Sequence, residues 1–463
     1  MLPSVKIPAS FEAVLAPLRV CFTAPTFTTF TTLVIGAVLQ TGPVTVCGML
    51  VGAGVAGTWH HSRGHRFFSL ARWCPDAVGV LLADLIVAQL LPPDEPITVL
   101  IDDTLFRRSG PKVHAAAWLY DGAAGNRKNK PGPGRKDTAT TAWGNCWVVA
   151  GLLVQLPFAA APTCLPVLAR LYQPGRNARR RGNRTLGAGQ GDSKQHLARD
   201  LIEILAYRHP DRTVHVVFDS AYGCRQLRGL PPNVTLTTRL IAKAALWAPP
   251  PPRQPGTRGR TRTKGDRLPN LAELARSRDG WHTATVTRYG TTSTIHVRTI
   301  HCLWYDVWLT QPVQVTLIRE PGRTGYQLAL ITTDPATTPA AIIERYATRW
   351  AIEVCFHEAK QVYHVGQAQN RTPQAVHRTV IFGLHTMTLT TIWYTTTGHH
   401  PTDLTHRRTN QPWRRDKTHP TATDMTAKLR RTTIANQFRP EPLRPPTQAE
   451  TTAVHHAWAA ATA

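Results

Sequence analysis

The chain has 463 residues, of which 42% are hydrophobic, so the composition excludes an intrinsically disordered protein and allows a large core. Lys and Arg number 54 and Asp and Glu number 28, which gives a formal net charge of +26 at pH 7. This excess indicates a polyanionic partner, because each phosphate that a cation neutralises releases counterions. An anionic membrane surface would instead require a basic amphipathic helix, and the sequence has no clear one.

The cysteines and the apolar segments argue against a secreted or membrane protein. The eight cysteines are scattered and form no CxxC pair, which predicts neither a zinc ribbon nor a disulfide framework and is typical of a reducing cytoplasm. The start of the chain lacks the charged segment and cleavage site of a signal peptide. Residues 32–57 are apolar, but Gln40 and Pro43 interrupt them. We therefore expect two buried segments joined by a turn rather than a membrane helix.

Residues 1–95 are predicted to be mostly helical. The clearest helical pattern covers residues 67–91, with a break at Cys74-Pro75. Just before it, the basic segment 60–66 (HHSRGHR) is either a contact for a DNA backbone or an ordinary solvated loop. The sequence does not decide between these two interpretations.

The β-branched run 97–101 predicts a buried strand that ends in carboxylates, since Asp102 and Asp103 come directly after it. The cations Arg107 and Arg108 follow within a few residues. A carboxylate beside cations suits metal-assisted phosphate chemistry, whereas an ordinary turn with an Asx hydrogen bond is the structural alternative. At this position alone, the two interpretations carry equal weight.

A second run of this kind, 213–218, leads into Asp219 and a turn. Between the two runs we expect a strand over 145–156, a further apolar element over 164–172 and an amphipathic helix over 193–207. Two strands that each end in an acid, with a helix between them, predict a βαβ unit with both acids at one edge of the sheet.

Glycine-rich and cationic segments interrupt this pattern. We expect a mobile cationic loop over 121–137, a basic and Gly-rich segment over 173–191, and an exposed basic loop over 249–267 that follows a phosphate backbone. The segment 281–332 alternates like a series of strands. From residue 398 onward the chain is rich in His, Thr and Arg without apolar periodicity, so we expect weak order there.

The segment 346–360 (YATRWAIEVCFHEAK) predicts one continuous helix, because it has strong helix formers and no Pro or Gly. At about 100° per residue, a stripe roughly 80° wide collects an acid, two cations and two aromatic residues: Tyr346, Arg349, Glu353, Phe356 and Lys360. The acid could hold a metal ion on its free oxygens while the cations hold phosphates. The structural alternative is a solvated helix face with an i,i+4 Arg–Glu pair, which stabilises a helix by a few tenths of a kcal/mol.

Together, these acidic segments predict a carboxylate cluster. If Asp102 or Asp103 converges with Asp219 and Glu353, their oxygens would bind two divalent cations. Two such ions clamp the attacking and leaving oxygens of an in-line phosphoryl transfer. With a net charge of +26, the substrate would be DNA or RNA.

The helix with the acid carries a recognisable pattern. Its spacing, Tyr346-x2-Arg349-x3-Glu353-x6-Lys360, resembles the YREK signature of bacterial cut-and-paste insertion-sequence transposases, which belong to the DDE superfamily. Taken alone, this spacing is a weak signal.

Three further segments resemble the same family. IDDT (101–104) and FDSAYG (218–223) are similar to its first and second acidic blocks, and RFFSLARW (66–73) is similar to part of its N-terminal region. The YREK spacing with both aspartate blocks in the right order is a strong signal. The resemblance covers most of residues 60–390.

This resemblance implies an α/β protein with an RNase H-like core, in which helices flank a central mixed sheet. A β-rich insertion is expected between the second aspartate and the glutamate. The implied parts are a helical N-terminal region that is a candidate for DNA binding, the first part of the catalytic core, the insertion, the remainder of the core with the YREK helix, and a basic, weakly ordered tail. Their ranges are 1–95, 96–234, 235–330, 331–395 and 396–463.

The resemblance also implies roles for single residues. Asp219 would be the second metal ligand and Glu353 the third. The first ligand would be Asp102, with Asp103 as the alternative, because the first block of the family often reads Asp, any residue, Thr. Adjacent strand residues face opposite sides, so only one of the two reaches the pocket. Five residues would bind DNA phosphates: Tyr346, Arg349, Lys360, Arg107 and Arg108.

The implied chemistry depends on two Mg²⁺ or Mn²⁺ ions. Water attacks a phosphodiester at the transposon end, and the freed 3′-hydroxyl then attacks the other strand or the target. The expected partners are double-stranded DNA with terminal inverted repeats and target DNA, bound by a dimer of the chain. We expect this to take place at the nucleoid in a bacterial cytoplasm and not at a membrane.

Many members of the family flip a base against aromatic residues. The candidates in the β-rich segment are Trp281, Trp304, Trp308 and Tyr326, although core packing is the more common role of such residues. Two other functions remain open: a non-catalytic DNA-binding protein derived from a transposable element, and a nuclease of the same fold without strand transfer.

Overall fold

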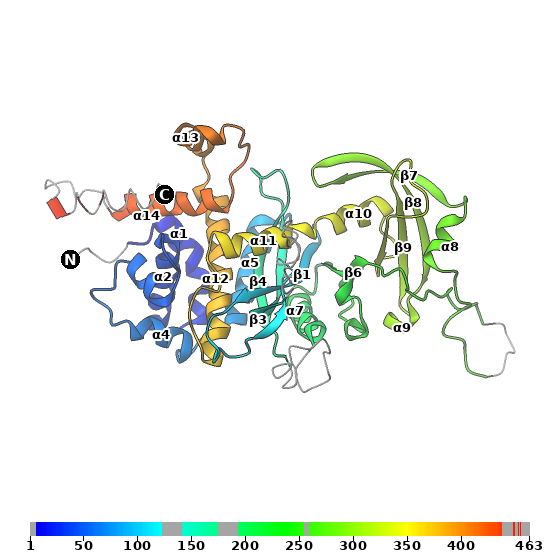
Figure 1. Cartoon of the computed structure of the whole chain (residues 1–463), viewed down its shortest axis with the longest axis horizontal. Coiled ribbons are helices and arrows are strands. Elements are labelled where there is room, and N and C mark those ends of the chain that lie inside the picture. The colour runs from blue at the N-terminus through cyan, green and yellow to red at the C-terminus, as the bar shows by residue number, and fades with distance from the viewer. Residues whose placement is uncertain are drawn as a thin grey trace, which may run out of the picture.

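The computed structural model describes residues 6–122, 141–174, 193–253 and 259–437, with a few positions between 448 and 454. Most of the predicted basic loops at 121–137 and 173–191 therefore lies outside the described residues, as does part of the loop at 249–267. The described part is elongated: helices gather at one end, a sheet runs through the middle, and a β-rich part forms the other end (Figure 1).

The described residues form one ten-stranded sheet in the order β2-β3-β1-β5-β6-β10-β9-β8-β7, with β4 paired to β3. Its strands are β1 Ile97–Arg107, β2 Ala117–Tyr120, β3 Thr141–Val154, β4 Thr163–Leu171, β5 Val214–Phe218, β6 Val234–Arg239, β7 Trp281–Arg288, β8 Thr291–Leu303, β9 Pro312–Arg319 and β10 Leu328–Thr332. The pairings β1–β5 and β5–β6 are parallel and the others are antiparallel. The sheet is therefore mixed, as the sequence predicts.

Helices cover the sheet and build the N-terminal end of the molecule (Figure 1). The α-helices are α1 Ala9–Leu15, α2 Ala24–Leu39, α3 Val46–Gly52, α4 Ser62–Ser69, α5 Pro75–Leu90, α7 Lys194–Arg208, α8 Leu271–Arg276, α9 Tyr305–Trp308, α10 Pro339–Ala347, α11 Trp350–Gln361, α12 Pro373–Trp393, α13 Asp403–Asn410 and α14 Ala422–Gln437. The short turns of other helix types are η1 Ala16–Cys21, η2 Ser220–Tyr222, η3 Arg225–Leu227, η4 Tyr394–Gly398 and η5 Pro412–Arg414.

The middle of the sheet has the order β4-β3-β1-β5-β6, with three antiparallel strands followed by two parallel pairings. The helix α7 follows β4 along the chain and precedes β5, so β1, the crossover and β5 form the predicted parallel unit. This is the RNase H-like mixed α/β architecture that the sequence predicts, and the structure confirms it.

The strand β1 is apolar on both faces, which places it in the interior of the sheet. Val99, Leu100 and Ile101 are fully buried. Val99 and Ile101 belong to the cluster that includes residues of α5 and α7, whereas Leu100 belongs to the cluster that includes residues of α11. The alternation of side chains along β1 therefore assigns α7 and α11 to opposite faces of the sheet.

The β-rich segment continues the core sheet. Its last strand, β10, pairs antiparallel with β6, and β9, β8 and β7 follow outward from it. Since β6 begins at Val234, the strand lies across the boundary predicted between 234 and 235. The helix α10 packs on β7, β6 and β10 and leads the chain back to the core.

The continuous helix predicted over 346–360 is wrong at one point, because the structure has two helices there. α10 ends at Ala347 and α11 begins at Trp350. The hydroxyl of Thr348 donates to the carbonyl oxygen of Arg345 at 2.7 Å, and such local side-chain bonds compete with the helical backbone pattern. The break lets α10 follow the β-rich part while α11 crosses the core (Figure 1).

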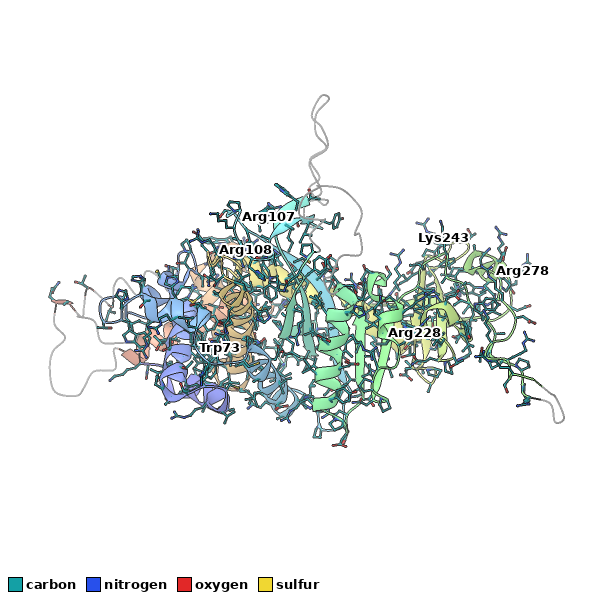
Figure 2. The ribbon with its side chains drawn as sticks, turned by 90° about the horizontal axis from the view of Figure 1, so that it is seen from below. Trp73, Arg107, Arg108, Arg228, Lys243 and Arg278 are labelled. Atoms are coloured by element: carbon teal, nitrogen blue, oxygen red, sulfur yellow. The ribbon has the colours of Figure 1, made fainter. Side chains whose placement is uncertain are left out.

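The RFFSLARW segment fastens the N-terminal helices to α12. Phe67, Phe68 and Trp73 are buried. Arg378 of α12 donates to the carbonyl oxygens of Ala71 at 2.7 Å and Trp73 at 2.6 Å, and its guanidinium lies 4.8 Å from the centre of the Trp73 ring. Figure 2 places Trp73 beside the N-terminal helices, away from the β-rich end. The segment therefore has a structural role here.

The apolar run 32–57 forms two packed helices, as the sequence predicts. α2 ends at Leu39 and α3 begins at Val46. A Cβ atom at Gly36 would overlap the carbonyl oxygen of Met49, so glycine is needed where these two helices meet. Among the described residues, no helix is both long enough and apolar enough to cross a membrane.

The segment from 396 onward differs from the weak order predicted for it, at least as far as residue 437. The helix α14 packs on α12 and α2, and its residues Met425 and Leu429 are buried in the main core. Lys428 of α14 pairs with Asp403 of α13 at 2.5 Å. A few apolar residues suffice because α12 supplies the surface that they cover. Most of residues 438–463 lies outside the described part.

A buried histidine should make the protein sensitive to acid. His385 of α12 is 1% exposed, its Nε2 lies 2.8 Å from the carbonyl oxygen of Val167, and burial lowers its pKa to about 4. Because the pKa of an unfolded histidine is about 6.5, His385 contributes stability above pH 6.5 that is lost as the pH falls towards 4, by up to roughly 3 kcal/mol.

We expect the melting temperature of the wild-type protein to fall steeply between pH 6.5 and pH 4 in thermal unfolding followed by circular dichroism. The His385→Gln variant should start lower, because the substitution disturbs a packed site, but should show a shallower decline with pH. Equal slopes for the two proteins would contradict this assignment.

Candidate active site

Asp102 and Asp219 lie on neighbouring parallel strands. The register pairs Ile101 of β1 with Phe218 of β5, and the two aspartates are the next residues along. Since paired strands run about 4.8 Å apart, both backbones carry an acid at the same level of the sheet. Asp219 Oδ1 also accepts from the backbone N–H of Ser220 at 2.7 Å, which orients its carboxylate at the start of a turn.

Glu353 joins this pair through Arg349. One guanidinium nitrogen of Arg349 lies 3.3 Å from Asp102 Oδ2 and the other lies 2.6 Å from Glu353 Oε1. All three side chains are partly buried, with exposed fractions of 21% for Asp102, 19% for Arg349 and 34% for Glu353. The first turn of α11 thus brings the third predicted acid to the strand that carries the first.

The position of Asp102 is unfavourable for its negative charge. The pKa of Asp102 is raised to about 6, mainly by burial and also by the nearby carboxylates of Asp103 and Asp219, whereas the Asp103 backbone N–H and Arg349 lower it. A partly buried carboxylate beside a second one is stabilised by added positive charge. The site therefore favours a cation in addition to Arg349.

Asp103 points to the opposite face of the sheet. Its carboxylate accepts from Lys194 Nζ at 2.6 Å, from the Tyr222 hydroxyl at 3.0 Å and from Cys146 Sγ at 3.2 Å. Burial raises the pKa of the Cys146 thiol to about 12, so this sulfur stays protonated and donates. Asp103 is thus satisfied on the α7 side, whereas Asp102 faces Arg349 on the α11 side.

The sequence does not indicate the partners of Asp103. Lys194 and Cys146 are far from Asp103 in the chain and belong to no motif. Tyr222 lies inside the FDSAYG block, and that position is the one signal that could have indicated a role.

Two of the predicted phosphate-binding residues, Tyr346 and Lys360, lie on α10 and α11, the helices on either side of Arg349. Tyr346, on α10, is half-buried; burial raises its pKa, and Arg349 and Asp219 are among the charges that act on it. Lys360, near the end of α11, has its ammonium 5.6 Å from the centre of the Phe106 ring, and burial lowers its pKa. Lys360 makes no ion pair with any residue that the structure describes, so its charge is available to an anion.

Arg107 and Arg108 are less free than the sequence implies. Arg107 pairs with Asp121 at 2.7 Å, while 64% of its side chain remains exposed. Arg108 donates to Asn145 Oδ1 at 2.9 Å and to the carbonyl oxygens of Gly366 at 2.8 Å and Ala368 at 2.7 Å. Figure 2 shows both arginines on one side of the molecule, near the end of β1. Arg108 therefore holds the segment after α11 against the end of β1.

The aromatic candidates of the β-rich part have mostly structural surroundings. Trp304 and Trp308 are 4% and 2% exposed and meet edge to face at 5.1 Å between ring centres. The ring of Trp281 is covered by the guanidinium of Arg319 at 3.7 Å. Core packing accounts for Trp304 and Trp308, and nothing in their surroundings indicates a stacked base.

The basic segment 60–66 begins α4. The guanidinium of Arg63 lies 3.5 Å from the centre of the Trp59 ring, and its Nε donates to the Thr29 hydroxyl at 3.1 Å. Ser62, in the same segment, pairs with His60 at 2.8 Å. The segment thus leads into and forms part of a helix, and it is not a free loop.

The donor set has the chemistry that a hard divalent cation requires, because all three predicted ligands are carboxylates. Across the described residues, however, no group of three His, Cys, Asp or Glu side chains is arranged so that it could hold a metal ion as it stands. Asp102 and Asp219 already lie together, and Glu353 is held by Arg349. Glu353 would have to leave Arg349 to share an ion with them.

The fold and the acid pair together define an RNase H-like nuclease core. A family model described as DDE superfamily endonuclease matches residues 17–304, which is more than half of the chain. The chain therefore belongs to the DDE superfamily endonucleases, and its class of activity is nuclease-type cleavage of DNA. The matched segment includes Asp102 and Asp219 and ends before Glu353. No curated protein matches the chain.

Proposed function

We propose that this chain is a DNA transposase that cleaves the ends of a transposon and joins them to target DNA by two-metal phosphoryl transfer. One observation carries the proposal: Asp102 and Asp219 lie at the same level of paired strands, and Arg349 links Asp102 to Glu353. The membership in the DDE superfamily supports cleavage of DNA. The YREK spacing of α10 and α11 supports the narrower assignment to insertion-sequence transposases.

In this proposal, Asp102, Asp219 and Glu353 hold two Mg²⁺ or Mn²⁺ ions, and Asp102 rather than Asp103 is the first ligand. When bound, the ions would supply Lewis acidity to the phosphate and lower the pKa of the attacking water. Arg349 pairs with two of the carboxylates in the present arrangement, so its single charge offsets only one of theirs. Its guanidinium would then be free to pair with a DNA phosphate in the bidentate way that arginine favours.

The reaction has two balanced steps. In the first, a water oxygen forms a bond to phosphorus at the transposon end and the bond between phosphorus and the 3′-oxygen breaks; one water proton ends on the 3′-oxygen, which becomes the 3′-hydroxyl, and the other passes to solvent. In the second, the freed 3′-hydroxyl forms a bond to a phosphorus of the target and loses its proton, the bond between that phosphorus and the target 3′-oxygen breaks, and the displaced 3′-oxygen takes up a proton. Tyr346 and Lys360 would orient the phosphates, because they lie on α10 and α11, the two helices on either side of Arg349, and α11 carries Glu353.

The remaining parts of the proposal concern partners. The substrate would be double-stranded DNA with terminal inverted repeats, and paired ends would require a dimer on DNA. The charge of +26 supports a DNA partner. The cell compartment would be a bacterial cytoplasm, at the nucleoid.

A plasmid assay tests the function. Supercoiled DNA that carries both ends of the genomic segment around the gene is incubated with the protein and Mg²⁺ or Mn²⁺. We expect cleavage at the ends and, with a second plasmid, joined products. Cleavage without joining would favour a nuclease of the same fold. Binding without cleavage under any metal would favour a non-catalytic DNA-binding protein, and either result would overturn the proposal.

A further inference from the structure

A cavity of about 1100 Å³ opens beside the end of β1. Its walls come from residues at and after the end of β1 (105–110, Val113 and Asp121), from the segment 360–371 at and after the end of α11, and from Pro43 and Thr45 just before α3. The core and the N-terminal region thus both contribute to it. The carboxylate cluster does not line this cavity, so it is a separate site.

The cavity lies in line with the carboxylates. Asp102 and Phe106 are four residues apart on β1, so they share a face, and they are separated by roughly 13 Å at about 3.3 Å per residue. Glu353 and Lys360 are seven residues apart on α11, or about 10 Å. Lys360 lies over the Phe106 ring, so the end of α11 and the end of β1 meet at the cavity. Both elements therefore run from the carboxylates to the cavity. This separation corresponds to three to four nucleotides at about 3.4 Å each.

The charge of the cavity suits a polyanion. Its described lining includes four cations, Arg107, Arg108, Lys360 and Arg371, and a single acid, Asp121, which pairs with Arg107. The ammonium of Lys360 is partly buried without an ion pair to any described residue. A partly buried cation in this state gains more from a bound phosphate than an exposed one does.

The same cavity carries amides that can read bases. Gln361 and Gln369 are exposed in its wall, and their side chains make no hydrogen bond within the described part of the chain. An amide can donate and accept at once, which is how Gln and Asn recognise the edge of adenine.

The wall that carries these amides is fastened on two sides. The Gln367 side-chain oxygen accepts from the backbone N–H of Val44 at 3.0 Å, and Arg108 binds the carbonyl oxygens of Gly366 and Ala368. The backbone N–H of His114 donates to the carbonyl oxygen of Arg371 at 3.0 Å. Gln361 and Gln369 are therefore presented on a held segment, which reduces the cost of ordering on binding.

We propose that this cavity binds the DNA segment three to four nucleotides from the cleaved phosphate. Lys360 and Arg371 contact its backbone, and Gln361 and Gln369 contact base edges. The inference rests on the proposed function, because it takes the carboxylate cluster as the point of cleavage. It assigns to this cavity the recognition of the base sequence next to the transposon end.

Photocrosslinking tests this assignment. The probes are 25-base-pair duplexes with a recessed 3′-hydroxyl and 5-iodouracil at one position, two to eight nucleotides from that end, bound to the full chain with Ca²⁺ to support binding. We expect crosslinks within residues 360–371 when the label is three or four nucleotides from the end. Duplexes that differ only in the base at this position should bind with unequal affinity.

Two variants separate base reading from folding. The double variant Gln361→Ala/Gln369→Ala should bind the preferred duplex about tenfold more weakly and lose the difference between bases, as expected when one base contact is removed. The control Gln226→Ala lies in η3, which packs on α7 and so belongs to the other face of the sheet, and should bind like the wild type.

Three results would overturn the inference: crosslinks only outside 360–371, a base preference that survives in the double variant, or displacement of the probe from this wall by a 12-residue polyglutamate peptide that carries a benzophenone group and itself crosslinks there. The last result would indicate an acidic protein partner. Failure of the proposed function would give a different result. Crosslinks within 360–371 without plasmid cleavage would support DNA binding in the cavity but reject the assignment as a transposase.

Discussion

Replacing Glu353 with Gln should lower the rate of metal-dependent DNA cleavage by about 10³-fold, because charge stabilisation worth several kcal/mol is lost and each 1.36 kcal/mol is a factor of ten in rate. The substitution keeps the size of the side chain and removes only its charge. The measurement is single-turnover nicking of supercoiled plasmid with Mg²⁺ or Mn²⁺, together with the affinity for DNA.

A matched control is Glu320→Gln. Glu320 is 39% exposed and pairs with Arg288 at 2.9 Å, so it resembles Glu353 in exposure and in having an arginine partner, but it lies in the β-rich part. We expect Glu320→Gln to cleave like the wild type, and both variants to bind DNA. Unchanged cleavage by Glu353→Gln would reject its assignment as a metal ligand.

Exchanging each of the two adjacent aspartates for Asn should give opposite results. Asp102→Asn should reduce cleavage about as strongly as Glu353→Gln while changing the melting temperature little, because burial already disfavours the charge of Asp102. Asp103→Asn should retain cleavage within about tenfold but lower the free energy of unfolding by roughly 2 to 4 kcal/mol, since Lys194 loses its charged partner.

Thermal unfolding and plasmid nicking on the same preparations measure both effects. The two substitutions are matched in chemistry and in sequence position, so the comparison controls for the general effect of removing a negative charge from β1. If Asp103→Asn abolishes cleavage and Asp102→Asn does not, the first ligand is Asp103, and the orientation argument from the strand is wrong.

The acids could be found from sequence because local patterns determine where they lie. A β-branched run before Asp102 and another before Asp219 predict two buried strands that carry acids, and the helix between them implies a parallel crossover. When β1 and β5 pair in parallel with the ends of the two apolar runs at the same level, the two aspartates lie side by side.

The surroundings of the acids could not be found in this way. The stripe on 346–360 assumed one helix, whereas the hydroxyl of Thr348 and the packing of α10 on the β-rich part divide it. Arg349 and Glu353 form the i,i+4 pair of the structural alternative, and the same guanidinium also reaches Asp102, which the helical pattern does not indicate. Contacts between residues about 250 positions apart leave no trace in local periodicity.

The C-terminal helix shows the same limit. α14 has a weak apolar pattern, and sequence alone favours disorder. Leu429 is nevertheless fully buried, because α12 and α2 offer an apolar surface that only the assembled fold creates. Tertiary packing, rather than local propensity, explains this helix.

The central claim is that Asp102, Asp219 and Glu353 share divalent ions. The most direct measurement is a crystal structure of the chain with DNA and saturating Mn²⁺, with the ions located by their anomalous scattering. We predict manganese peaks in contact with all three carboxylates and Arg349 moved from between Asp102 and Glu353 to a DNA phosphate. Manganese bound by other residues, with Glu353 still on Arg349, would contradict it.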